Sequence, residues 1–479
     1  MTTIFSRQLR LAVLVLSATA LPYSFAYAQS QVADTTQVAS PSTATIAQNL
    51  FAEIAQNNQL MLNLEELCDG IGPRLTGSPQ LRLAQQWAME KLKAYGAVNV
   101  HEEAYDLGKS WTRGVAHVRL MNANGMSLDV RQLAWSESSP RKVQAEVVLM
   151  NVKTLDEFKR IAPRLHGKIV LALSVPRATR EQEKNFKQYS DELNKAIQAA
   201  NFSAIFFVSG REGNLQDMEG SPKMRYKKNA AFITKEHANL LQRLMARGIT
   251  PKLEFEFGGR LSKDGVKAYN VVADFPGTEQ ADEMVVLGAH QDSWDLGTGA
   301  TDNGVGTVVT MEVLRAMHAL KLKPKRTLRV VLFSGEEQGL LGSKAYLKTH
   351  AAEQGKIQAM LTQDAGGGRI TGFLDMKVEA WYTALNEAKE QSKELNFLDI
   401  TYAAGGGSDH QAFFEQGIPA FAPIQDPLDY RSHTWHSQVD TVDHVVPDQV
   451  MQNAQVMAAM TWAMLNGKKL PHQAAQVSR

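Results

Sequence analysis

Apolar segments of strand length alternate with helical segments from about residue 268 to residue 467. The strand-like segments are MVVLGAH, TLRVVLFS, IQAMLTQ and IPAFAPI, and the helical ones are GVGTVVTMEVLRAMHAL, GLLGSKAYLKTH and VEAWYTALNEAKEQSKEL. This alternation predicts an α/β fold with a mostly parallel central sheet and helices on both of its faces. Ligands of such sheets bind beyond the carboxyl ends of the strands. The functional residues are therefore expected in the loops that follow these segments.

Side chains that can bind metals follow three of the predicted strands. His290 and Asp292 come after MVVLGA, Glu336 and Glu337 come after TLRVVLFSG, and Asp364 comes after IQAMLTQ. Each of them alone has an ordinary explanation, such as a hydrogen-bonded histidine, a turn or a solvated surface. Their occurrence after three separate strands predicts instead that they share one site.

Two further candidates lie elsewhere in these loops. Asp302 stands in TDNG at the start of a helix, where capping would explain an isolated aspartate, and His436 stands in HTWHSQVDT. Imidazole and carboxylate donors without a cysteine suit zinc, and less selectively manganese or cobalt. A carboxylate such as that of Asp302 can bridge two ions about 4 Å apart, the separation found in two-metal hydrolases. His433 and His410 remain alternatives for the last ligand, because spacing alone does not distinguish them from His436.

The sequence thus predicts a cage for two Zn²⁺ ions per chain. One ion is assigned to His290, Asp302 and Asp364, and the other to Asp302, Glu337 and His436. Adjacent side chains in an extended loop diverge, so Glu336 can face the substrate when Glu337 faces a metal. Glu336 is therefore predicted to be the general base that removes the proton of the attacking water.

Two aspartates are predicted to support the cage from behind. Asp292 is expected to orient His290, and Asp440 to orient His436, each through the second ring nitrogen of the histidine. Asp292 is counted with Glu336 among the catalytic residues on this basis.

Other nucleophiles fit the sequence less well. Cys68 is the single cysteine, which excludes an internal disulfide, and it has no matched histidine motif, so a buried structural role is expected. Ser408 and Ser334 do not stand in a Gly-x-Ser-x-Gly turn. The glycine runs at 366–368 and 405–407 lack the Lys-Ser/Thr that completes a phosphate-binding loop.

The N-terminus predicts export. Basic residues precede a short apolar run that ends in Ala26-Tyr27-Ala28, which is typical of a signal peptide cleaved after Ala28. A periplasmic or secreted protein without a stable membrane anchor is expected. The 51 basic and 50 acidic residues nearly cancel, which gives no support to a nucleic-acid partner.

Changes of pattern along the chain predict five parts. These are the signal peptide 1–28, an N-terminal part of the catalytic domain at 41–110, an inserted β-rich segment at 111–261, the main part of the catalytic domain at 262–467 and a polar tail at 468–479. The inserted segment contains the strand-like stretches VAHVRLM, AEVVLMN, KIVLALSV, SAIFFVS and KLEFEF between polar helices. No His, Glu or Asp residues in it have catalytic spacing, so it is expected to be mostly non-catalytic.

Five motifs in order resemble a known family. GAHQDSWDLGTGATDNGVG, FSGEEQGLLGSKAY, TQDAGG, GGGSDHQAF and HSQVDT are similar to those of the co-catalytic zinc exopeptidases, which include bacterial leucyl aminopeptidases and glutamate carboxypeptidases. The layout looks most like the plasma glutamate carboxypeptidase branch. The family's metal ligands map onto His290, Asp302, Glu337, Asp364 and His436. The resemblance also implies that Glu336 is the base and favours His436 over His433.

The resemblance carries further expectations. It implies that the 111–261 segment is a protease-associated-like domain, and it allows a homodimer. Several relatives have tyrosine directly before the last histidine ligand, where its hydroxyl can stabilise an oxyanion, whereas this chain has Trp435. The oxyanion partner stays unassigned, with Tyr430 as a candidate.

The expected function is hydrolysis of the terminal peptide bond of dipeptides or short peptides, as an aminopeptidase or dipeptidase. A carboxypeptidase with the same mechanism is the main alternative, since arginine would bind a free carboxylate and acidic groups a free amine. Arg369, Arg431, Asp409, Asp426 and Asp429 all lie near the site motifs and are not ranked by the sequence. A non-catalytic binding protein and a single-zinc cyclase on the same fold are further alternatives.

Overall fold

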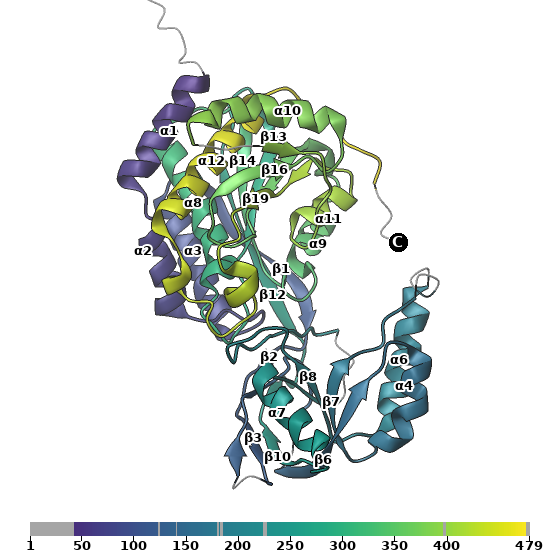
Figure 1. Ribbon diagram of the computed structural model, residues 1–479. Coiled ribbons are helices and arrows are strands. Elements are labelled where there is room, and N and C mark those ends of the chain that lie inside the picture. The colour runs from purple at the N-terminus through teal and green to yellow at the C-terminus, as the bar shows by residue number, and fades with distance from the viewer. Residues whose placement is uncertain are drawn as a thin grey trace, which may run out of the picture. The chain divides into compact units, whose positions relative to one another are not determined.

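A six-stranded sheet forms the centre of the catalytic part (Figure 1). The computed structural model describes residues 43–122, 125–139, 141–179, 182, 185–223, 228–395 and 399–475. The strands of this central sheet lie in the order β1 (Val98–Gly108), β12 (Val266–Phe275), β14 (Arg326–Phe333), β13 (Gln280–His290), β15 (Ile357–Thr362) and β18 (Ala420–Phe421). The last four run parallel to one another, while β1 and β12 pair antiparallel at one edge. The predicted α/β class is confirmed, and the sheet is mixed.

Helices cover both faces of the central sheet. One face packs on α1 (Thr43–Asn57), α2 (Leu60–Glu65), α3 (Pro79–Ala94), α8 (Val305–Ala319), α10 (Glu379–Lys389) and α12 (Pro447–Asn466). The other packs on α9 (Leu341–Thr349) and α11 (His410–Glu415). Within β13, Val285 and Leu287 enter the first core, and Met284 and Val286 enter the second. The alternation of side chains along a strand thus explains why this segment is apolar throughout.

The segment 111–261 forms a sheet of its own. The order is β4 (Met126–Ser127), β3 (Ala116–Leu120), β10 (Lys252–Phe257), β6 (Val143–Asn151), β7 (Ile169–Ser174), β8 (Ala204–Val208), β9 (Asn229–Ile233) and β5 (Val130–Gln132). Strands β6 to β9 are parallel. The chain enters through β2 (Trp111–Thr112) and leaves through β11 (Arg260–Leu261), which pair with each other.

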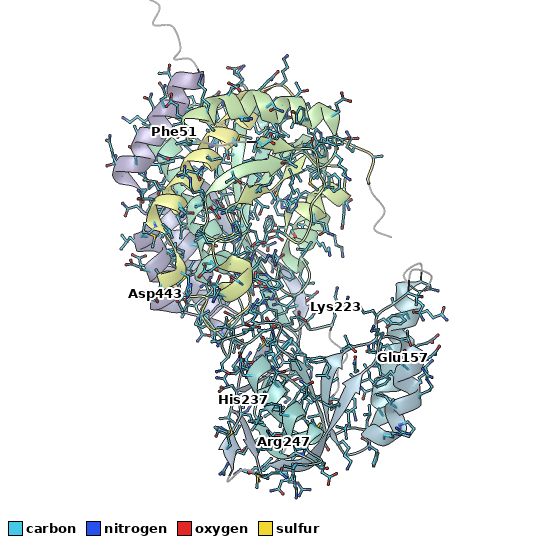
Figure 2. All side chains as sticks on the ribbon, in the orientation of Figure 1. Phe51, Glu157, Lys223, His237, Arg247 and Asp443 are labelled. Carbon is cyan, nitrogen blue, oxygen red and sulfur yellow. The ribbon has the colours of Figure 1, made fainter. Side chains whose placement is uncertain are left out.

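Helices also belong to this segment, so it is an α/β unit with more helix than the β-rich expectation. They are α4 (Leu155–Ile161), α6 (Phe186–Ala200) and α7 (Lys235–Ala246). Helix α4, which carries Glu157 (Figure 2), begins with a capping box. Thr154 accepts from the Glu157 backbone N–H, and the Glu157 side chain accepts from the Thr154 N–H.

A small third sheet completes the catalytic part. Its order is β17 (Asp399–Thr401), β16 (Ile370–Leu374) and β19 (Pro423–Gln425). The predicted signal peptide lies outside the described residues, as does the end of the predicted polar tail beyond residue 475. None of the helices in the described part of the chain is both long and apolar enough to cross a bilayer.

The aromatic core of the second sheet gives a test of its contribution to stability. Phe206 is fully buried, with its ring centroid 6.2 Å from that of Phe255 and 6.0 Å from that of Phe257. We expect Phe206→Ala to lower the free energy of unfolding of this segment by about 3–5 kcal/mol, because it leaves a cavity in a packed core. Urea denaturation monitors the change. Leu149→Ala is the control, since Leu149 is 42% exposed on β6 and should cost little.

Candidate metal centre

Three parallel strands bring the predicted site residues to one edge of the central sheet. His290 ends β13, Glu336 and Glu337 lie just beyond the end of β14, and Asp364 lies just beyond the end of β15. His290 is paired in register with Phe333, the last residue of β14. The loops therefore start at the same level, as expected for the carboxyl edge of a parallel sheet.

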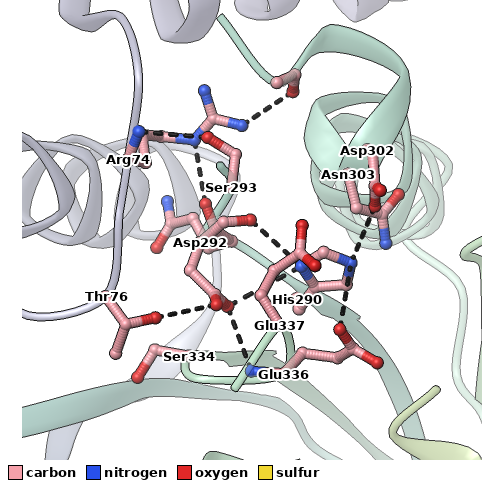
Figure 3. Close-up of polar contacts among 12 residues, drawn as sticks. Arg74, Thr76, His290, Asp292, Ser293, Asp302, Asn303, Ser334, Glu336 and Glu337 are labelled. Atoms are coloured by element: carbon pink, nitrogen blue, oxygen red, sulfur yellow. Dashed lines mark hydrogen bonds and ion pairs between the residues drawn. The ribbon is translucent and has the colours of Figure 1, made fainter. Parts of the chain in front are cut away.

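The first group of candidate ligands consists of His290, Asp302 and Asp364. Nε2 of His290 lies 3.3 Å from Oδ1 of Asp302 (Figure 3). The same nitrogen lies 3.3 Å from Oδ1 of Asp364. Its other nitrogen, Nδ1, lies 3.0 Å from the backbone oxygen of Asp292. With Nδ1–H donated to that oxygen, Nε2 would be the ring nitrogen available to a cation shared with the carboxylates.

The second group shares Asp302 with the first. Nε2 of His436 lies 3.6 Å from Oδ2 of Asp302 and 2.9 Å from Oε2 of Glu337. The two oxygens of Asp302 thus belong to different groups, one beside each histidine. The structure brings together all five predicted ligands in two clusters that meet at this carboxylate.

The competing histidines lie apart from these clusters. His433 is exposed, with Nδ1 beside the Ser432 hydroxyl, and buried His410 has Nε2 beside the backbone oxygen of Gly405. Within the described residues neither joins a group of His and carboxylate donors that could hold an ion. His436 is therefore the histidine that the geometry favours.

The electrostatics of the site require positive charge. Burial raises the pKa of Glu336 well above its usual range, and the nearby carboxylates of Asp364 and Glu337 add to the rise. Burial and Asp302 raise the pKa of Glu337 in the same way. The buried oxygens Oδ2 of Asp302 and Oε1 of Glu337 accept no hydrogen bond from the described residues. Such orphaned oxygens beside imidazole nitrogens form a donor set that fits divalent cations.

Arg74 holds the loop that joins His290 to Asp302 and was not predicted from the sequence. Its guanidinium is fully buried and donates to the backbone oxygens of Gln291 (2.8 Å), Thr298 (2.7 Å) and Gly299 (2.8 Å) (Figure 3). These bonds reach both ends of the loop. The one indication in the sequence is weak: Arg74 stands in the turn-rich stretch IGPRLTGS.

The predicted supporting aspartates have different surroundings. Asp292 lies behind His290, with Oδ1 3.6 Å from Nδ1, and it accepts from the Thr76 hydroxyl at 2.8 Å and from the Glu336 N–H at 3.4 Å. It therefore connects the loop of His290 with that of Glu336.

The predicted contact between Asp440 and His436 was wrong. Asp440 accepts from the N–H of Thr301 at 2.7 Å, from its hydroxyl at 2.8 Å and from the N–H of Asp302 at 3.1 Å. Both carboxylate oxygens are used in this way, so Asp440 positions the backbone of the bridging residue. Burial raises the pKa of Asp440 to about 7.

A cleft of about 340 Å³ opens onto the clusters. It is lined by Asp302, Glu336, Glu337, Gly339, Leu340, Asp364, Gly407, Gln411, Tyr430, Arg431, Trp435 and His436. A larger cavity of about 670 Å³ lies in the 111–261 segment, and its lining contains none of the candidate ligands. The smaller cleft is therefore the one associated with the chemistry.

The 111–261 segment contacts the loop that carries His436. The N–H of Gln216 donates to Oε1 of Gln438 at 2.8 Å, and Nε2 of Gln438 donates to the backbone oxygen of Asn214 at 3.1 Å. The guanidinium carbon of Arg211 lies 5.7 Å from the ring centroid of Trp435. The segment therefore packs against the loop that carries His436, although it supplies none of the candidate ligands and none of the residues that line the cleft.

The alternative nucleophiles are occupied or unreactive. Burial raises the pKa of Cys68 to about 11, so its thiol is a poor nucleophile at neutral pH. The Ser334 hydroxyl donates to the backbone oxygen of Tyr269 at 2.8 Å. Both residues serve the packing around the site.

Comparison with known proteins identifies relatives of this chain. Residues 270–461 match the sequence profile of Peptidase family M28. Carboxypeptidase Q from Bos taurus is 28% identical over 431 residues, which cover 87% of this chain and 87% of that protein. The crystal structure of a peptidase M28 precursor from Shewanella amazonensis superposes with a TM-score of 0.77 at 28% identity, over 90% of this chain and 99% of that one.

A more distant structure shares the fold. BSAP, described as a zinc aminopeptidase from Bacillus subtilis, matches 90% of this chain and 97% of its own with a TM-score of 0.65 and 18% identity.

Replacement of Arg74 tests how far the site depends on its loop. We expect Arg74→Lys to lower the free energy of unfolding by about 2–4 kcal/mol, since one ammonium cannot satisfy the separate buried carbonyls that the guanidinium now reaches. Thermal and urea denaturation measure the effect. The matched control is Arg247→Lys at the exposed end of α7 (Figure 2). Equal stability of the two variants would contradict this role.

Proposed function

Because residues 270–461 belong to peptidase family M28, we propose that this chain is a dinuclear zinc exopeptidase that hydrolyses terminal peptide bonds of dipeptides or short peptides. We favour an aminopeptidase or dipeptidase, with a carboxypeptidase of the same mechanism as the alternative suggested by the name of the relative. The observation that carries the proposal is the position of Asp302, whose two oxygens face different histidines.

The proposed metal cage divides the ligands as the two clusters do. His290, Asp302 and Asp364 would hold one ion, and Asp302, Glu337 and His436 the other. Nitrogen and carboxylate donors of this kind suit zinc, and manganese or cobalt could substitute. When bound, the ions supply Lewis-acid polarisation of the peptide carbonyl and lower the pKa of water to roughly 7.

Glu336 is the proposed general base. It lines the cleft, its Oε2 lies 4.0 Å from Nε2 of His290, and it belongs to neither ligand cluster. Its carboxylate is therefore free to take a proton from the attacking water. The same carboxyl group then delivers the proton to the leaving amine, which completes the hydrolysis.

Tyr430 is proposed to support the oxyanion. It lines the same cleft and is nearly buried. Burial raises the pKa of Tyr430 well above its usual range, which keeps the phenol protonated and able to donate a hydrogen bond. Trp435, which stands where several relatives have tyrosine, stacks on His436 at 3.9 Å between ring centroids.

The proposal has three further parts. The protein is exported to the periplasm or the medium, it forms a homodimer, and its 111–261 segment is a protease-associated domain. The pairing of β2 with β11 supports an insertion, because the chain leaves and re-enters the catalytic part at one point. Two ligand clusters favour the peptidase over a single-zinc cyclase or a binding protein that has lost ligands.

The role of Glu336 predicts a selective loss of catalysis. We expect Glu336→Gln to lower kcat on a dipeptide roughly 10²- to 10⁴-fold, because the amide cannot accept the proton. Metal content should be unchanged. Glu387→Gln, on the exposed surface of α10, is the control and should keep full activity. Undiminished hydrolysis by Glu336→Gln would exclude this mechanism.

The cage predicts metal stoichiometry. Inductively coupled plasma mass spectrometry should find two zinc ions per chain in the wild type and one in His436→Ala. Asp302→Asn should bind less zinc at both positions, because Asp302 belongs to both clusters. His433→Ala is the matched control from the same loop and should retain two. Loss of metal from His433→Ala with retention by His436→Ala would reverse the assignment.

A further inference from the structure

Arg431 is a fixed positive charge in an acidic cleft. Four carboxylates, those of Asp302, Glu336, Glu337 and Asp364, line the same cleft. Among the described residues of this lining, the other group that can carry positive charge is His436, which is a candidate metal ligand. Once metal ions occupy the clusters, Arg431 is the side chain of the lining that can attract an anion.

Aromatic rings hold the guanidinium by its face. Its central carbon lies 4.6 Å from the ring centroid of Trp435 and 5.3 Å from that of Tyr430. Stacking of this kind leaves the N–H edges of a guanidinium available. Arg431 is exposed, and in the described part of the chain its guanidinium has no hydrogen bond or ion pair with another residue.

The neighbouring arginines are already engaged. The guanidinium of Arg211 forms an ion pair with Asp217 at 3.0 Å, and that of Arg369 donates to the backbone oxygen of Leu395 at 3.1 Å. Neither lines the cleft. Of the arginines considered as carboxylate partners, Arg431 is the one that the structure leaves free at the site.

The distance from the metal cage matches one or two residues of substrate. The ring of Trp435 lies 4.6 Å from the guanidinium carbon of Arg431 and 3.9 Å from the ring of His436. Arg431 is therefore no farther from the imidazole of His436 than the sum of these two lengths. An extended residue spans roughly 3.5 Å, so a carboxylate one or two residues beyond the scissile bond falls within reach.

We propose that Arg431 binds the free α-carboxylate of the substrate through paired N–H···O bonds and so selects di- and tripeptides with an unblocked C-terminus. This inference rests on the proposed peptidase function and specifies its substrates. Arg431 acts by binding the end of the substrate, so it should affect KM more than kcat.

The test compares leucyl-alanine with leucyl-alanine amide. Wild type should prefer the free acid. Arg431→Gln should raise KM for the acid about 10- to 100-fold with little change in kcat, and should leave hydrolysis of the amide unchanged. The KM of Arg431→Lys for the acid should lie between those of the wild type and Arg431→Gln, since an ammonium keeps the positive charge but cannot form the paired N–H···O bonds. Arg369→Gln is the matched control and should behave as the wild type.

The outcomes separate the inference from the function on which it rests. If the zinc-loaded wild type hydrolyses neither peptide, nor a longer one, the proposed peptidase function fails. If the wild type hydrolyses both and Arg431→Gln loses equal activity on both, the peptidase stands and carboxylate recognition by Arg431 is overturned. Preference of the wild type for the amide also overturns it. Melting temperatures and zinc content of each variant identify losses caused by misfolding.

Discussion

Mutual repulsion of buried carboxylates is the constraint on which the rest of the site depends. Two like charges about 4 Å apart repel by roughly 4 kcal/mol at an effective dielectric constant near 20. A carboxylate oxygen of Asp364 and one of Glu337 each lie within 4.8 Å of an oxygen of Asp302. Among the described residues that line the cleft there is no lysine to relieve this repulsion. Oδ2 of Asp302 and Oε1 of Glu337 accept no hydrogen bond from the described residues, so bound cations would stabilise the site.

Holding repelling groups in place requires rigid supports, and two buried charged residues provide them. Arg74 ties the loop after β13 through backbone oxygens, and Asp440 ties the backbone of Asp302 through N–H and hydroxyl donors. Neither residue belongs to the ligand clusters. Each secures main chain, so the ligands they support are placed by peptide geometry more than by flexible side chains.

The sequence predicted what local pattern determines and missed what tertiary structure decides. His290, Glu336 and Asp364 could be placed because each follows an apolar strand. Strand β1 was not predicted, since its sequence VNVHEEAYDLG is polar and the strand lies at the edge of the sheet, with nearly all of its residues exposed or half-buried. Arg74 and Asp440 bind backbone groups distant in sequence, and no spacing rule reports such partners. The resemblance to a family selected His436 over His433, which spacing could not do.

The two-sided burial of β13 limits how this protein can change in length during evolution. Alternate residues of the strand fill separate cores, and its last residue is His290. Inserting or deleting one residue within the strand would exchange the contents of both cores and rotate the imidazole to the opposite face. Length changes are better tolerated outside such strands, as in the 111–261 segment, whose two ends are joined by the pairing of β2 with β11.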